Sequence, residues 1–97
     1  MRLTTHQQTT IKKLTTDIFG TDAHLMLFGS RVDDTKKGGD IDLYIETQNS
    51  DATLDKKIKL LTALNLALGE QKIDLIVNNF TKKKAIYTIA KQTGIEL

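Results

Sequence analysis

The spacing of apolar residues in the first half of the chain predicts one helix and two strands. Within residues 4–19, apolar positions recur three and four residues apart, and Gly20 follows as a stop signal, which predicts a helix. Residues 24–28 form a short, nearly continuous apolar run that is typical of a buried strand. Polar and apolar residues alternate over residues 40–46, and this period of two predicts a second strand.

A longer amphipathic segment follows a polar turn at residues 47–52. Ser50 or Asp51 is a plausible N-cap and Gly69 is a C-terminal stop signal, so the segment between them predicts a second helix. Its apolar positions define the face that we expect to be buried, namely Leu54, Ile58, Leu61 and Leu68, widened by Leu60, Leu64 and Ala67.

The rest of the chain predicts a strand at residues 73–77 and a helix at residues 81–93 that Gly94 closes, with residues 95–97 as a final extended piece. The order is therefore helix, strand, strand, helix, strand, helix. The connection between the second and third strands is long enough for a helical crossover between parallel strands. We expect an α/β fold in which a small mixed sheet of three to four strands is flanked by helices, with residues 1–97 as a single domain.

Composition excludes several classes of protein but says little about function. The 97 residues contain no cysteine, which excludes disulfides and thiolate zinc sites within the chain. No apolar run approaches the roughly 20 residues of a membrane-spanning helix, and the N-terminus has no apolar signal region, so we expect a cytoplasmic protein. The formal net charge of +2 is too small to indicate nucleic-acid binding from composition alone.

Two carboxylates in the second strand are the first candidates for chemistry. Successive side chains of a strand point to opposite faces, so Asp40 and Asp42 share one face and the apolar residues between and after them share the other. We expect the apolar face to be buried and the carboxylate face to be functional. Such carboxylates hold Mg²⁺ together with substrate phosphates, and the Gly29-Ser30 turn before them offers backbone N–H groups to phosphate. Taken alone, an edge strand with protective charges and an ordinary Gly-Ser turn explain the same residues.

The combination of these features resembles the nucleotidyltransferase signature of the DNA polymerase β superfamily. An apolar strand leads into Gly29-Ser30, nine residues separate this pair from Asp40-Ile41-Asp42, and Asp74 follows in a later strand. Within the superfamily the chain is most similar to the minimal nucleotidyltransferases (MNT), and the similarity runs from the first helix to the strand that carries Asp74. The resemblance implies a polymerase β-like nucleotidyltransferase core.

The resemblance also implies a role for each carboxylate. Asp40 and Asp42 correspond to the pair that coordinates two Mg²⁺ ions, which bind the nucleoside triphosphate and lower the pKa of an attacking hydroxyl. Asp74 corresponds to the third carboxylate, which joins the metal site and helps to activate the acceptor hydroxyl. The alternative for Asp74 is an ion pair with Lys72 at the end of its strand.

Three residues of the turn correspond to the nucleotide-binding part of the family's site. Gly29 and Ser30 match the phosphate-binding turn, and Arg31 matches an arginine that neutralises triphosphate charge. The alternative for Arg31 is a surface ion pair with one of the next carboxylates, Asp33 or Asp34. Many MNT sequences carry a second arginine soon after this one, which is missing here, and two loop lysines are candidates to replace it, Lys36 and Lys37.

Lys82, Lys83 and Lys84 form the densest run of charge. They fall in the first turn of the predicted last helix, where positive charge opposes the helix dipole. A solvated face is the simpler explanation, and contact with an acidic partner or RNA phosphate is the alternative. His6 and His24 receive no catalytic role, because one lies in a polar helix start and the other at the flank of a strand.

For stand-alone MNT chains, the resemblance implies the antitoxin of a toxin–antitoxin pair whose other member is a helical HEPN ribonuclease. Such an antitoxin transfers AMP from ATP to a tyrosine hydroxyl of its partner, which also implies a hetero-oligomer. Three alternatives remain open: a binding antitoxin that masks its partner sterically, a small-molecule nucleotidyltransferase that acts as a homo-oligomer, and a nucleic-acid polymerase. We expect no contact with a membrane and no direct binding of nucleic acid.

Overall fold

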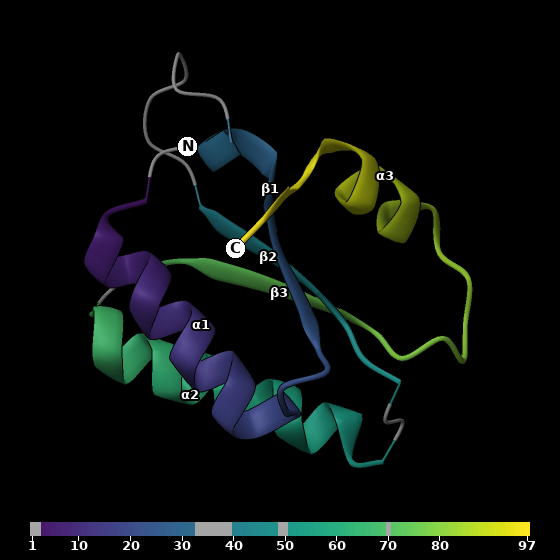
Figure 1. Cartoon of the computed structure of the whole chain (residues 1–97), viewed down its shortest axis with the longest axis horizontal. Helices are drawn as coiled ribbons and strands as arrows, with labels where there is room; N and C mark the ends of the chain where they lie inside the picture. Colours follow the sequence, from purple (N-terminus) through teal and green to yellow (C-terminus); the bar gives the residue numbers. More distant parts are fainter. Residues whose placement is uncertain (1–2, 33–39, 49–50, 70) are drawn as a thin grey trace.

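The computed structural model describes residues 3–32, 40–48, 51–69 and 71–97 of the chain. These residues form three α-helices, four strands and one short 3-10 helix, labelled η1 (Figure 1). In chain order the elements are α1 (Thr5–Phe19), β1 (His24–Phe28), η1 (Gly29–Val32), β2 (Ile41–Glu46), α2 (Thr53–Leu68), β3 (Ile73–Asn78), α3 (Ala85–Thr93) and β4 (Ile95–Glu96).

The four strands form one mixed sheet in the order β3-β2-β1-β4. Strand β1 pairs antiparallel with β2 and with β4, whereas β2 and β3 are parallel and α2 forms the crossover between them. This topology confirms the predicted α/β fold with a small mixed sheet flanked by helices. The predicted strands also agree with the observed ones to within one residue at each end, the main difference being that β2 begins at Ile41, directly after Asp40.

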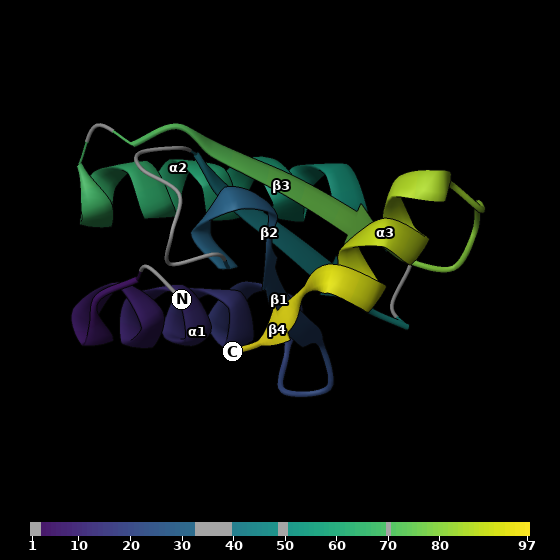
Figure 2. The same ribbon diagram turned by 90° about the horizontal axis from the view of Figure 1, so that it is seen from above.

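One face of the sheet is covered by α1 and α2, which lie side by side (Figure 2). Helix α1 begins with a capping box, in which the Thr4 hydroxyl accepts the Gln7 N–H (3.0 Å) and the Gln7 side chain accepts the Thr4 N–H (2.9 Å). Burial of a large aliphatic or aromatic side chain contributes roughly 1.5–3 kcal/mol, so this layer dominates the stability of the domain. Its buried members include Ile11, Phe19, Leu25, Leu27, Ile41, Leu43, Ile45, Leu60, Leu64 and Leu75.

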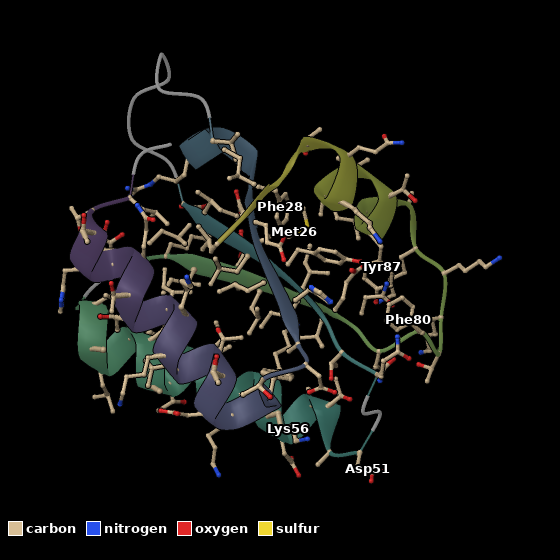
Figure 3. All side chains as sticks on the ribbon, viewed as in Figure 1. Met26, Phe28, Asp51, Lys56, Phe80 and Tyr87 are labelled. Carbon is tan, nitrogen blue, oxygen red and sulfur yellow. The ribbon has the colours of Figure 1, made fainter. Side chains whose placement is uncertain are left out.

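The opposite face of the sheet is covered in part by α3, so the structure has three layers (Figures 1 and 2). Phe28, Tyr44 and Ala90 form a second, smaller core there, with Met26 and Tyr87 packed against it (Figure 3). Most of the carboxylate face of β2 is therefore covered as well, since Tyr44 and Glu46 are buried. Only the end of this face that carries Asp42 remains partly exposed.

Helix α2 departs from prediction in its start and in its buried stripe. It begins at Thr53 after Ala52, an N-cap in left-handed conformation, instead of an Asp51 cap, while Gly69 ends it as predicted; the other predicted cap, Ser50, lies outside the described residues. Leu60 and Leu64 are fully buried and Leu61 and Leu68 are half-buried, but other predicted members of the stripe are exposed, namely Leu54, Ile58 and Ala67. Apolar residues surround most of α2, so their spacing alone does not select the face that contacts α1 and the sheet.

Helix α3 begins at Ala85, four residues later than predicted, and ends at Gly94 as predicted. Lys82, Lys83 and Lys84 therefore lie in the preceding loop, and Lys84 has extended backbone angles. The side-chain oxygens of Asn78 and Asn79 accept hydrogen bonds from the backbone N–H groups of residues 80 and 81, which hold this loop in turns and delay the helix. None of the helices that the structure describes combines the length and apolarity needed to span a membrane.

Candidate active site

Two of the three predicted carboxylates face each other across neighbouring strands. Asp42 of β2 pairs in parallel register with Asp74 of β3, so both side chains project from the same face of the sheet. Their carboxyl groups lie within hydrogen-bonding reach of each other. Asp42 is half-buried, whereas Asp74 is exposed on β3, the strand at the edge of the sheet.

The third carboxylate, Asp40, precedes β2 and forms an ion pair. Its Oδ2 lies 3.5 Å from the Nζ of Lys72, and both side chains are substantially exposed. The N–H of Ile41 donates to the carbonyl oxygen of Lys72 (3.0 Å), which joins the backbones at the start of β2 and β3. Lys72 thus pairs with Asp40, and the proposed alternative of an ion pair between Lys72 and Asp74 is not the pairing observed.

The pKa of Asp42 is raised from 3.8 to about 6. Burial of the carboxyl is the largest cause, followed by the negative charge of Asp74, a hydrogen bond with Asp74 and the charge of Asp40, while Lys72 acts in the opposite direction. Negative charge is therefore concentrated around a partly desolvated group. Sites that bind a cation or exchange a proton often contain carboxylates that repel each other in this way.

Gly29 brings the backbone of the predicted phosphate-binding turn directly against Asp42. Strand β1 pairs Phe28 with Asp42, so the next residue of the chain stands beside the Asp42 carboxylate. Gly29 has a φ of +78°, and a Cβ at this position would collide with Oδ2 of Asp42. Both the backbone angle and the close approach require glycine here. The 3-10 helix η1 starts at this residue.

The other predicted nucleotide-binding residues, Ser30 and Arg31, lie in η1. Arg31 is half-buried, and its Nη2 donates to the side-chain oxygen of Gln71 at 3.4 Å, which links η1 to the segment before β3. The residues proposed as an alternative partner or as a substitute for a second arginine lie outside the described part of the chain, namely Asp33, Asp34, Lys36 and Lys37.

An open groove of about 450 Å³ contains both Asp42 and Asp74. Its walls are mostly apolar and come from β1, β2, β3, α2 and α3, and Lys57 of α2 is the lysine among the described residues that line it. Lys57 was not among the predicted site residues. Lys57 precedes Leu61 by four residues, so both side chains lie on one side of α2 and both line the groove. This spacing is the pattern in the sequence that could have indicated Lys57.

A buried polar chain continues from Asp42 along the same face of β2. The Tyr44 hydroxyl donates to Oε2 of Glu46 (2.9 Å) and accepts from Nδ2 of Asn78 (3.0 Å), and Lys91 of α3 lies 3.3 Å from the same Glu46 oxygen. Burial is the main reason why the pKa of Tyr44 is raised. This network fixes α3 to the sheet. Sequence reasoning missed it, although the alternation along β2 places Tyr44 and Glu46 on the face of Asp42.

The donor set at this end of the sheet fits a hard divalent cation only in part. Asp42 and Asp74 offer paired carboxylate oxygens, the ligand type that Mg²⁺ prefers, and the mutual repulsion that raises the pKa of Asp42 is what a cation would relieve. No group of three or more His, Cys, Asp or Glu side chains suited to a metal is assembled among the described residues. Asp40, paired with Lys72, is the predicted ligand that stands apart.

Comparison with known proteins assigns the chain at the level of the family. No curated protein matches it. The family "Polymerase beta, Nucleotidyltransferase" matches residues 10–97, which include all of β1, η1, β2 and β3 and every residue of the predicted site. The three helices and the four-stranded mixed sheet are consistent with the α/β core of that family. The chain therefore belongs to the polymerase beta nucleotidyltransferase family.

Proposed function

We propose that the protein is a Mg²⁺-dependent nucleotidyltransferase that transfers AMP from ATP to a hydroxyl group of another protein. The observation that carries this proposal is the register of β2 and β3, which sets Asp42 opposite Asp74 at the point where the Gly29 backbone meets the Asp42 carboxylate. A phosphate-binding turn and a cation-binding carboxylate pair in direct contact are the two parts that nucleotidyl transfer requires.

The proposed reaction forms one bond and breaks one. The acceptor oxygen attacks the α-phosphorus of ATP, the bond from that phosphorus to the α,β-bridging oxygen breaks, and pyrophosphate leaves. The exposed Asp74 carboxylate takes the proton of the acceptor hydroxyl, while Gly29, Ser30 and Arg31 of η1 hold the triphosphate. Mg²⁺ held by Asp42 and Asp74, with Asp40 once it leaves Lys72, would supply neutralisation of phosphate charge.

The acceptor in this proposal is a tyrosine of a HEPN-type partner, and the chain acts as the antitoxin of that partner. Two observations support a protein acceptor. Asp74 stands on an edge strand, where a side chain from another molecule can reach it. Leu54 and Ile58 are 68% and 55% exposed, and their spacing of seven and three residues from Leu61 extends the apolar wall of the groove along α2.

The exposed apolar side of α2 also favours a second candidate, an antitoxin that masks its partner sterically without catalysis. Apolar side chains of this size on a surface helix are typical of protein interfaces. This candidate needs Leu54 and Ile58 but not the carboxylates. The two functions therefore predict different effects for the same pair of variants.

A transfer assay separates the candidates. The protein is incubated with Mg²⁺, with ATP labelled at the α-phosphate and with the HEPN-type protein encoded by the adjacent gene, and the label on the partner is measured. We expect labelling that Asp42→Asn lowers by about 10³-fold, because the lost interaction is worth several kcal/mol in the transition state. Asp17→Asn, an exposed carboxylate of α1, serves as the control and should label normally.

Inhibition of the partner by an Asp42→Asn, Asp74→Asn double variant distinguishes catalytic from steric inhibition. The catalytic proposal expects the double variant to leave the partner active. Full inhibition by this variant, together with loss of inhibition in Leu54→Ser, Ile58→Ser, would instead support steric masking. Absence of label on any partner residue with the wild-type protein would overturn the transfer proposal.

A further inference from the structure

A second cavity, of about 430 Å³, lies at the loop between β3 and α3. Phe80, Lys82, Lys83, Lys84 and Tyr87 line it, and the two aromatic residues lie near each other in Figure 3. None of its lining residues is a member of the groove that holds Asp42 and Asp74. The cavity is therefore a separate site, and the proposed transfer reaction does not use it.

Lys82, Lys83 and Lys84 place three positive charges side by side on this cavity. All three side chains are exposed, and the ion pairs found among the described residues involve other cationic groups, those of Lys13, His24, Lys72 and Lys91. Like charges repel, and the loop enters the positive end of the α3 dipole. Within the described structure this charge is uncompensated, which is the condition for binding a polyanion.

Phe80 presents an aromatic ring at the edge of the same cavity. Its side chain is 52% exposed and its backbone has a φ of +64°, a left-handed conformation that bulky residues rarely adopt. The turn is held by hydrogen bonds, since Asn78 Oδ1 accepts the Phe80 N–H (2.9 Å) and Asn79 Oδ1 accepts the Thr81 hydroxyl (2.6 Å). The fold thus holds a half-exposed ring in a strained backbone conformation, as residues at binding sites often are.

We propose that this cavity binds single-stranded nucleic acid, with a base stacked on Phe80 and the adjacent phosphates on Lys82, Lys83 and Lys84. Among macromolecular polyanions, single strands expose both a flat π-face and regularly spaced phosphates, and proteins bind them with basic side chains beside exposed aromatic rings. An acidic peptide complements the lysines but provides no stacking partner for Phe80. A duplex keeps its base faces inside the stack. The proposal departs from the expectation, based on net charge, that the chain does not bind nucleic acid directly.

Fluorescence anisotropy of labelled ten-nucleotide strands tests the proposal with the full chain in EDTA. Oligo(U), oligo(A) and oligo(dT) are titrated at several salt concentrations, and a labelled poly-glutamate peptide serves as the acidic-peptide probe. The variants are a Lys82→Gln, Lys83→Gln, Lys84→Gln triple, Phe80→Gly and Phe80→Tyr. A triple of equal charge change at exposed lysines of α1 and α2 is the matched control, Lys12→Gln, Lys13→Gln, Lys59→Gln.

The cavity triple should weaken strand binding at least about tenfold and reduce the slope of log affinity against log salt by about 2, as loss of three phosphate contacts requires. Phe80→Gly should weaken binding roughly tenfold through loss of one stacked base, whereas Phe80→Tyr keeps the ring and the affinity. Because glycine accepts a positive φ, Phe80→Gly should remain folded, as checked by urea denaturation.

Three results would overturn the proposal. Equal weakening by the cavity triple and the control triple would mean that net charge alone governs binding. Poly-glutamate binding that is as tight as strand binding and is insensitive to Phe80→Gly would mean that the cavity receives an acidic protein. Transfer activity provides an independent reading, because none of these variants touches the carboxylates. Failure of strand binding with intact transfer would therefore reject this inference and leave the proposed function standing.

Discussion

The two faces of the β-sheet are made by alternate residues of the same strands, yet they differ in what they bury. On the face under α1 and α2, each inward side chain of β2 is aliphatic and fully buried. On the face under α3, β2 contributes the half-buried Asp42 and the buried Tyr44 and Glu46, and hydrogen bonds and an ion pair satisfy the last two. The first face therefore stabilises the fold through apolar burial, which does not depend on the exact position of any one atom. The second face holds individual polar atoms in fixed positions.

The contrast is sharpest between Asp42 and Leu43, which are adjacent in β2. Leu43 is completely buried in the apolar layer, while Asp42 is half-buried beside Asp74 with a raised pKa. Leu43 stabilises the folded state, whereas the charged Asp42 carboxylate destabilises it and forms part of a charged site. Variants at such neighbouring positions should therefore separate stability from chemistry.

The largest effect on stability is expected for Leu43→Ala. Truncation of a fully buried leucine leaves a cavity, so the free energy of unfolding should fall by about 3 kcal/mol. Urea denaturation measures this change, and Thr62→Ala on the exposed side of α2 is the control. The transfer rate per folded molecule should change little. A variant with intact stability and lost transfer would show that the two faces are not separable in this way.

Gly29→Ala should lower both the stability of the fold and the transfer activity. Gly69→Ala is its matched control. Both glycines have a φ near +80°, so each substitution carries the backbone strain of a left-handed alanine, about 1–2 kcal/mol. At Gly29 the added Cβ would collide with the Asp42 carboxylate, whereas at Gly69 no atom of the described part of the chain lies within 4 Å of it. The loss of stability should therefore be larger for Gly29→Ala by about 1 kcal/mol or more, and only this variant should lose transfer activity.

Equal losses for the two glycine variants would show that Gly29 serves the backbone turn alone. Denaturation and the transfer assay, run on the same preparations, distinguish the two outcomes. A displaced Asp42 carboxylate should also lower the apparent affinity for Mg²⁺, while Gly69→Ala should leave that affinity unchanged.

The apolar face of β2 and the strand positions of Asp42 and Asp74 could be predicted from the sequence, because both depend on local periodicity. Alternation along β2 indicated Asp42, and the family resemblance indicated Asp74 in a later strand. Their register, in contrast, is a property of the parallel pairing of β2 with β3, which no local pattern specifies. The family resemblance placed the two carboxylates together before their contact was known.

The errors arose where tertiary contacts override local preference. Apolar residues occupy most positions around α2, so Leu54 and Ile58 could be recognised as exposed only from the packing of α1 and the sheet. Lys82–Lys84 have good helix propensity, but the hydrogen bonds of Asn78 and Asn79 hold the preceding turn and α3 begins later. These contacts also create the lysine-lined cavity, which could therefore not be predicted from the sequence.

Tyr44→Phe tests whether the polar network under α3 has the importance that its burial indicates. Loss of the hydroxyl leaves Glu46 and Asn78 each without one hydrogen bond in a buried site, so the free energy of unfolding should fall by about 1–2 kcal/mol. Tyr87→Phe is the control, because its hydroxyl makes one longer bond, 3.3 Å to the carbonyl oxygen of Val77, and its loss should cost less. Equal effects would mean that α3 is held by ring packing, with the hydroxyls contributing little.

The smallest effect concerns the charge of Asp42 itself and is measured as a dependence of stability on pH. Below pH 3.8 the carboxyl is protonated in both the folded and the unfolded chain. Between pH 3.8 and about 6 the folded protein keeps a proton that the unfolded chain has released, so the free energy of unfolding decreases as pH rises, and above about pH 6 the cost is constant. The shift corresponds to roughly 3 kcal/mol at full strength, which solvent screening of this half-buried side chain reduces to about 1 kcal/mol.

Asp42→Asn removes this titration while keeping the shape of the side chain. Urea denaturation in EDTA at about pH 4 and about pH 7 should show that the variant becomes more stable than the wild-type protein by about 1 kcal/mol only at the higher pH. Asp17→Asn, whose carboxylate lies on the surface of α1, should show no such gain. If Asp42→Asn lost stability at neutral pH instead, the carboxylate would be a structural member of the fold. A gain accompanied by loss of transfer would show that this face of the sheet keeps Asp42 for chemistry at the expense of stability.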